Sequence, residues 1–121
     1  GLVRRVIRGR RDDTVGAYLY CVRPKGVGFV LQTLAERGAE ETVVADLLAD
    51  ARRRGAVAVR GRVQPEFADA LLRRRAVFVH AASTVIHSRR ADLLAVVAGG
   101  EALLTGLAGE SWSRLIGGVF L

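Results

Sequence analysis

The segment from Gly28 to Gly61, GFVLQTLAERGAEETVVADLLADARRRGAVAVRG, constrains the fold more than any other part of the chain. An apolar run from Phe29 to Ala35 is followed by a polar loop, a stretch with helical spacing and a second apolar run, Ala56 to Val59. Short apolar runs with glycine and polar boundaries are typical of strands, and we expect the first to be buried on both faces of a sheet. Two strands joined by a helix predict a parallel βαβ unit.

A helix between the two runs is predicted by an apolar stripe and by the charges at its ends. Glu40 and Glu41 precede the stripe and Arg52 to Arg54 follow it, an order that complements the helix dipole. Gly55 then supplies the left-handed conformation that commonly ends a helix. The stripe recurs at i, i+1, i+4, i+5 and i+8, which are Val43, Val44, Leu47, Leu48 and Ala51.

Two further strands are predicted before this segment. Val3 to Arg8 and Val15 to Val22 carry β-branched and aromatic residues, and the polar stretch Gly9 to Thr14 has the composition of a turn. Pro24 to Gly26 turns the chain again, into the strand of the central segment. Strands joined by short polar turns predict an antiparallel meander.

A second helix and two late strands are predicted after the central segment. Pro65 is well placed as the first residue of a helix that ends at Arg74. Ala76 to His80 and Ser83 to His87 favour two strands. The apolar positions of the helix repeat the earlier spacing and are Phe67, Ala68, Leu71 and Leu72.

The last part of the chain is predicted to be helical. Ser88 is placed to cap a helix that reaches about Ala98 and ends at Gly99-Gly100. We expect its apolar residues Leu93, Leu94 and Val97 to face inward. Glu101 to Leu121 is expected to form a helical tail.

Length and composition indicate one domain, from residue 1 to residue 121, that buries its own core. No apolar run approaches the roughly 18 residues that span a bilayer, so we expect a soluble, cytoplasmic protein with no membrane partner. The chain begins with Gly1 rather than methionine, and we interpret it as a processed chain, a fragment or a partial domain. Cys21 is the single cysteine and is expected to be a buried structural thiol in a reducing compartment.

The net charge of +7 comes almost wholly from arginine, because Lys25 is the only lysine. Such a charge is compatible with a nucleic-acid surface or with solvated helix ends, such as Arg52 to Arg54 and Arg73 to Arg75. The sequence has few aromatic residues for base stacking, so nucleic acid is not the partner we favour. Arginines gathered on one face would support nucleic-acid binding, and scattered arginines would exclude it.

The predicted order of elements gives an α/β fold class, more specifically a mixed α+β fold with one sheet and covering helices. It resembles the GNAT N-acetyltransferase fold without its first strand and two helices: a meander, a βαβ unit, a second helix, two late strands and a helical tail. The likeness covers Val15 to Trp112 and lies mainly in core and turn residues. The segments that carry it are Gly28 to Gln32, Leu47 to Ala51, Arg54-Gly55, Gly61-Arg62 and Ala102 to Trp112.

The resemblance implies acetyl-CoA as the cofactor, with its pyrophosphate where the central strand meets the helix. Free backbone N–H groups and the helix dipole bind anions at such a place. The usual signature, Gln or Arg followed by x-x-Gly-x-Gly or Ala, is absent, and Glu40 and Glu41 place negative charge there. By position, the cofactor-facing residues are Leu34, Ala35, Arg37, Gly38 and Ala39.

The resemblance also implies a general base and a general acid for acyl transfer. Glu36 is the best-placed candidate for the base. His80, on one late strand, is a candidate for the acid, and His87, on the other, is the alternative candidate. Tyr18 and Tyr20 lie too early in the chain for this role, and alternation places both on one face of their strand for packing. Two histidines and one distant cysteine give no metal-binding spacing.

Two functions therefore stay open. The first is an acyl-CoA-dependent N-acyltransferase that transfers an acetyl group to a small-molecule or peptide amine. The second is a non-catalytic GNAT-like module for dimerisation or partner binding, in which a homo-oligomer or a second domain completes the sheet. If Glu40 and Glu41 fold away from the Gly38 loop, the structure supports the N-acyltransferase. If they cap the helix, it supports the non-catalytic module.

Overall fold

A computed structural model describes residues 1–79, 86–102 and 107 of the chain. These residues belong to two compact units, Gly1–Val77 with Leu107, and the described residues that follow Val77, which we treat separately. The elements of the first unit are β1 (Leu2–Arg8), β2 (Thr14–Cys21), β3 (Val27–Ala35), α1 (Glu40–Arg53), β4 (Ala58–Gly61), the 3₁₀ helix η1 (Pro65–Phe67) and α2 (Ala68–Arg73).

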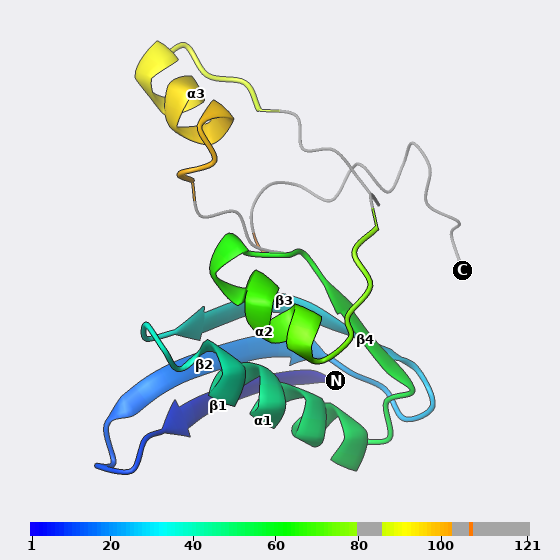
Figure 1. Cartoon of the computed structure of the whole chain (residues 1–121). Helices are drawn as coiled ribbons and strands as arrows, with labels where there is room; N and C mark the ends of the chain where they lie inside the picture. The colour runs from blue at the N-terminus through cyan, green and yellow to red at the C-terminus, as the bar shows by residue number, and fades with distance from the viewer. Residues whose placement is uncertain (80–85, 103–106, 108–121) are drawn as a thin grey trace. The chain divides into compact units, whose positions relative to one another are not determined.

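The four strands form one mixed sheet in the order β1-β2-β3-β4. The pairs β1–β2 and β2–β3 are antiparallel, and β4 runs parallel to β3 (Figure 1). The predicted meander, the βαβ unit and the mixed α+β fold class are thus confirmed, although β4 begins two residues later than predicted. Pairing of β3 with β4 ends at Val30 and Gly61, well before the end of β3 at Ala35.

An extra residue in β3 lies next to this point. Tyr20 is opposite Val30 and Leu19 is opposite Gln32, so Leu31 has no partner on β2. Such a bulge bends its strand and increases its twist. Among the described residues, no strand therefore pairs with the last residues of β3 on the side of β4, and we call this side the free edge of β3.

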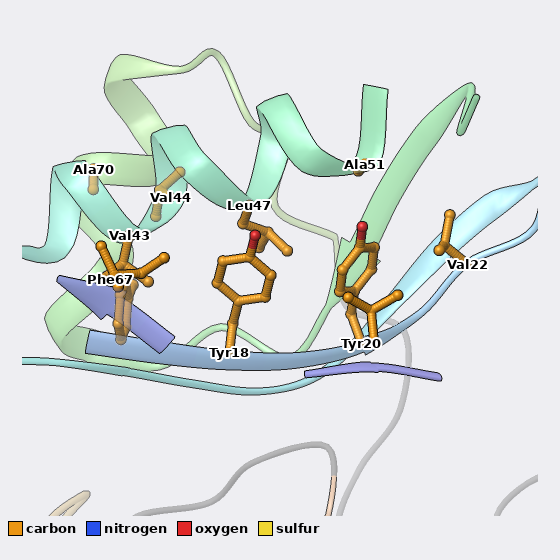
Figure 2. Packing of buried hydrophobic residues seen from close by; sticks show 11 residues of the cluster. Tyr18, Tyr20, Val22, Val43, Val44, Leu47, Ala51, Phe67 and Ala70 are labelled. Atoms are coloured by element: carbon orange, nitrogen blue, oxygen red, sulfur yellow. The ribbon is translucent and has the colours of Figure 1, made fainter. Parts of the chain in front are cut away.

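The hydrophobic core lies between one face of the sheet and the helices α1 and α2 (Figure 1). Figure 2 shows the rings of Tyr18 and Tyr20 directed from β2 toward α1. Gly16 allows this close packing, because a Cβ there would lie 2.3 Å from Val43 Cγ2. The predicted stripe of α1 is confirmed, with Val43, Val44, Leu47 and Ala51 buried and Leu48 packed against them.

The opposite face of the sheet, which we call the open face, is defined by three rows of paired residues. The rows are Leu2, Cys21, Phe29 and Arg60; Arg4, Leu19 and Gln32; and Val6, Ala17 and Leu34. Exposed fractions are 65% for Leu2, 51% for Val6, 38% for Phe29 and 46% for Leu34.

Two predictions fail at the open face. The strand at Phe29 was expected to be buried on both faces, yet α1 and α2 cover only one of them. Cys21 was expected to be a buried thiol and is free and exposed. Alternation along β2 is the reason, because it directs Tyr20 toward the helices and its neighbour Cys21 away from them.

The second predicted helix is present with a tighter start. Pro65 occupies its first turn as predicted, but that turn is 3₁₀ and the α-helical part ends at Arg73. Phe67 and Ala70 are its buried residues, whereas Leu72 is 56% exposed and does not face inward. Phe67 and Ala70 join the core cluster that contains Val43 and Val44 of α1 (Figure 2).

In the second unit the described residues include one helix, α3 (Ala91–Ala98). It begins later than predicted, because Ser88 Oγ accepts the N–H of Arg90 at 3.1 Å in a turn before the helix. Gly99 and Gly100 end it as predicted. Its apolar residues do not face inward, since none is buried.

The two late strands are only partly testable. Ala76–Val79 are described and form no strand, and neither do Ile86 and His87. His80, residues 81–85 and the predicted tail, except for residues 101, 102 and 107, lie outside the described residues. Within the described part of the chain, no helix is long and apolar enough to cross a membrane.

Candidate functional site

The free edge of β3 is partly occupied by the side chain of Gln64, which follows β4. Its Oε1 accepts the backbone N–H of Thr33 at 3.3 Å and the Thr33 hydroxyl at 2.8 Å. Its Nε2 donates to the Thr33 carbonyl at 3.0 Å and to Glu66 Oε1 at 3.2 Å. An amide has two donors and two acceptor sites, so all four are used, which explains how Gln64 is 97% buried without an unsatisfied group.

The local sequence explains why Gln64 points into the sheet. The residue before a proline avoids the helical region, and Gln64 is extended, with φ −105° and ψ 131°. Its side chain makes no cap hydrogen bond to η1 and reaches β3 instead. The sequence analysis did not single out Gln64; a polar residue before a helix-starting proline was the available signal.

Ala35 is the next residue of β3 whose backbone faces this edge. The N–H and C=O of Thr33 point away from β2, because both bind Gln64. Backbone groups two residues apart in a strand point to the same side, so those of Ala35 do as well. Glu36 confirms the alternation, because its N–H points to the other side and donates to the carbonyl of Val15 on β2 at 2.8 Å. No turn or side-chain hydrogen bond from the described residues reaches the Ala35 groups.

A tight turn connects this edge to α1. Ala39 N–H donates to the Glu36 carbonyl at 2.9 Å, and Gly38 has φ +88°, a value that favours glycine. Helix α1 starts at the next residue, and its first N–H groups, up to that of Thr42, have no partner within the helix. Free N–H groups and the positive end of the dipole therefore lie next to the Ala35 edge.

The two glutamates at the start of α1 behave differently. Glu40 Oε2 accepts the N–H of Gly38 at 2.8 Å, so this carboxylate occupies the loop. Glu41 turns away and pairs with Arg74, with Oε1 at 2.7 Å from Nη2. Of the two outcomes expected for these residues, Glu41 shows the first, because it folds away, whereas Glu40 shows neither: its carboxylate binds the loop, and no side chain of the described residues caps α1. The Glu40 contact also demonstrates that the loop N–H is directed to receive an anionic oxygen.

The structure brings together most of the predicted site residues. Ala35, Glu36, Arg37, Gly38 and Ala39 form the strand end and the turn, whereas the backbone of Leu34 faces β2. Glu36, Arg37 and Gly38 are exposed. The predicted acid His80 lies outside the described residues. Its alternative, His87, belongs to the second unit.

Tyr18 and Tyr20 are bound to two aspartates of α1 rather than free for catalysis. The Tyr18 hydroxyl donates to Asp46 Oδ2 at 2.6 Å, and that of Tyr20 donates to Asp50 Oδ2 at 2.7 Å. Burial, and then the hydrogen bond to Asp50, raise the pKa of Tyr20 to about 12. Burial and the bond to Asp46 raise the pKa of Tyr18 further. The predicted packing role of both tyrosines is confirmed.

Asp50 is the most buried carboxylate of this cluster, with 3% of its surface exposed. Burial opposes its ionisation, but hydrogen bonds from Arg54, Tyr20 and Arg53 outweigh that effect and lower its pKa to about 2. Sequence reasoning did not identify Asp46 and Asp50. Their spacing of four beside the apolar stripe of α1 was the signal, because such spacing places both on one side of a helix.

The arginines are distributed over the first unit rather than gathered on one face. Arg4 and Arg60 lie on the open face, whereas Arg5 lies on the helix-covered face and pairs with Asp46 at 3.1 Å. Arg53 and Arg54 bind Asp50. No group of three or more metal-ligating side chains occurs among the described residues.

Comparison with solved structures places this geometry in a known fold. A Trypanosoma brucei acetyltransferase superposes with a TM-score of 0.53 and 18% identity, over 73% of this chain and 70% of that one. A ribosomal-protein-alanine N-acetyltransferase from Brucella melitensis biovar Abortus superposes with a TM-score of 0.50 and 18% identity, over 72% and 71%. No protein-family model and no curated protein sequence matches. The β3–α1 junction and the parallel β4 are thus parts of a GNAT-like fold, the fold of these acetyltransferases.

Proposed function

We propose that the free edge of β3 and the start of α1 bind an acyl-CoA, and that the domain serves acyl transfer to an amine. The observation that carries this proposal is the backbone N–H and C=O of Ala35, which no hydrogen bond from the described residues reaches and which lie one turn from the first N–H groups of α1. An extended chain with amide groups fits such an edge as an added strand would. A phosphate fits the helix start.

Each predicted cofactor residue then has a distinct role. Ala35 binds a pantetheine amide through its backbone, and the exposed side chain of Leu34 offers apolar surface beside it. Gly38 donates its N–H to the pyrophosphate, Arg37 adds a positive charge, and Ala39 keeps the turn closed through its bond to Glu36. The bound cofactor supplies the activated thioester.

Transfer requires an amine that is neutral when it attacks the thioester carbonyl. The new C–N bond forms as the C–S bond breaks, the amine loses a proton, and the thiolate gains one. Glu36 is our candidate for the base, because its exposed carboxylate follows Ala35 directly. His80 stays the candidate for the acid. That the acceptor is a small-molecule or peptide amine stays a prediction, and so does the cytoplasmic location.

Glu40 provides the test, because its carboxylate occupies the N–H that the pyrophosphate would use. We expect Glu40→Gln to bind acetyl-CoA about tenfold more tightly than the unmodified chain, because it removes a negative charge beside the pyrophosphate; tenfold corresponds to about 1.4 kcal/mol. Glu41→Gln is the matched control, because Arg74 already neutralises Glu41. Isothermal titration at low and moderate salt measures both affinities.

The comparison of low with moderate salt distinguishes a specific acetyl-CoA site from a general electrostatic attraction to arginine side chains. Saturable binding that persists at moderate salt, and that Glu40→Gln tightens more than Glu41→Gln does, supports the proposal. Binding that disappears as salt screens the charges, or the same change in both variants, contradicts it.

The open face supports a second candidate, a module that binds a partner. Its rows contain large exposed apolar side chains together with Arg4 and Arg60, and no acidic residue. We propose an amphipathic helix with acidic flanks as the occupant, supplied by another domain or chain. A second copy fits this face less well, because it would bring the same arginines against each other.

Two designed peptides test this surface. One presents a leucine stripe flanked by glutamates, and the other the same stripe flanked by lysines. We expect the acidic peptide alone to bind, in fluorescence anisotropy, and Leu2→Ser to weaken it. Leu72→Ser is the control, because Leu72 is also more than half exposed but lies on α2. Equal binding of both peptides, or equal effects of the two substitutions, would refute the helix proposal.

A further inference from the structure

The hydrogen bonds of Gln64 are those that a neighbouring strand would make. In a sheet, the N–H and C=O of one residue bind the peptide groups of the next strand. Here the N–H and C=O of Thr33 bind a side-chain amide instead. The Gln64 amide therefore takes the place of a β4 peptide at this position.

One side-chain amide satisfies one residue of the edge and no more. Had β4 continued its pairing beyond Gly61, its next peptides would have reached Thr33 and then Ala35. With Gln64 in place, the N–H and C=O of Thr33 are both bonded, and no hydrogen bond from the described part of the chain reaches those of Ala35. The burial of Gln64 and its fourth bond, to Glu66, hold the amide in this position.

We propose that Gln64 is a positioning residue for the ligand of the β3 edge. It fixes the peptide planes beside Ala35 and prevents the chain after β4 from closing the edge, so that an extended amide ligand meets an ordered and open partner. This role rests on the proposed acyl-CoA function. It assigns no contact between Gln64 and the reacting atoms.

The test compares two glutamine substitutions of identical chemistry. Gln64→Leu removes the amide that binds Thr33, whereas Gln32→Leu removes a neighbouring amide from the open face. We expect Gln64→Leu to weaken acetyl-CoA binding about tenfold in isothermal titration, the scale of one or two lost hydrogen bonds. Gln32→Leu is expected to stay within twofold of the unmodified chain.

Hydrogen exchange adds a measurement that a purely structural role does not change. Acetyl-CoA is expected to slow exchange of the Ala35 amide in the unmodified chain and in Gln32→Leu. In Gln64→Leu, the Thr33 amide exchanges faster and the ligand no longer protects Ala35. Circular dichroism verifies that the variants are folded. If Gln64→Leu does not fold, Gln64→Asn, which withdraws the same amide by one methylene, is expected to show the same loss.

Each outcome decides between the two proposals. Equal affinity and equal Ala35 protection in Gln64→Leu and Gln32→Leu would overturn the positioning role alone. An unmodified chain that shows no binding of acetyl-CoA would overturn the proposed function and, with it, this role. Weaker binding restricted to the Gln64 variants supports both.

Discussion

Both faces of the sheet carry large apolar side chains, but only one face is buried by helices. On the helix-covered face, Tyr20 is completely buried against α1, as is Val43 of that helix, and the Tyr20 hydroxyl donates to Asp50. On the open face, Leu2 and Val6 keep more than half of their surface. The difference indicates that the helix-covered face carries most of the folding stability, and the exposed apolar side chains of the other face are the reason for the partner surface proposed above.

The largest expected difference between the faces is in the free energy of unfolding after removal of a leucine side chain. Leu47→Ala, on the covered face, is expected to cost about 3 kcal/mol, because it deletes buried methyl groups and leaves a cavity. Leu2→Ala, on the open face, is expected to cost less than about 1 kcal/mol. Urea unfolding measures both. Similar losses would mean that the open face is covered in the folded chain.

A smaller effect is expected from acid, through Asp50 on the covered face. Its pKa is lowered from the ordinary 3.8 to about 2 in the folded state, so its stabilisation is complete above pH 4 and is lost as the pH falls from about 4 to about 2. The loss is about 2 kcal/mol, at 1.36 kcal/mol per pKa unit. Urea unfolding across this pH range measures it.

Tyr20→Phe is the matched variant for the acid prediction. It removes a hydroxyl that donates to Asp50, so the acid-dependent loss shrinks and unfolding at neutral pH becomes easier by about 1.5 kcal/mol. An acid profile identical to that of the unmodified chain would show that the Tyr20 hydroxyl does not stabilise the Asp50 carboxylate.

The smallest effect on stability is expected at Cys21, on the open face. Its exposed thiol should react with a maleimide in the native state at nearly the rate of a free thiol, and the adduct should change the unfolding free energy by less than about 0.5 kcal/mol. Mass spectrometry follows the reaction. Labelling only after unfolding would place Cys21 under a covering segment.

Sequence periodicity predicted the βαβ unit because the stripe from Val43 to Ala51 and the charges at both ends of α1 depend only on local spacing. It did not predict the open face, because an apolar strand such as β3 has the same pattern whether one or both of its faces are covered. Whether a face is covered depends on how distant elements pack in the tertiary structure, and local sequence does not determine it.

The polar groups were the hardest to assign from sequence. Gln64 and Asp50 each gain their role from a partner on another element, Thr33 on β3 and Tyr20 on β2. Their separations in the chain are 31 and 30 residues. The turn between β3 and α1 was predictable from Gly38, but the different directions of Glu40 and Glu41 were not, because Glu41 pairs with the distant Arg74.

The most direct test of the acyl-CoA site is a titration of the isotope-labelled chain with acetyl-CoA, followed by amide chemical shifts. The account predicts that the largest changes occur at Ala35 and Gly38 and in the first turn of α1, and that they persist at moderate salt. Changes confined to basic residues away from this edge, such as Arg23, Lys25 and Arg52, that vanish as salt is added would contradict it.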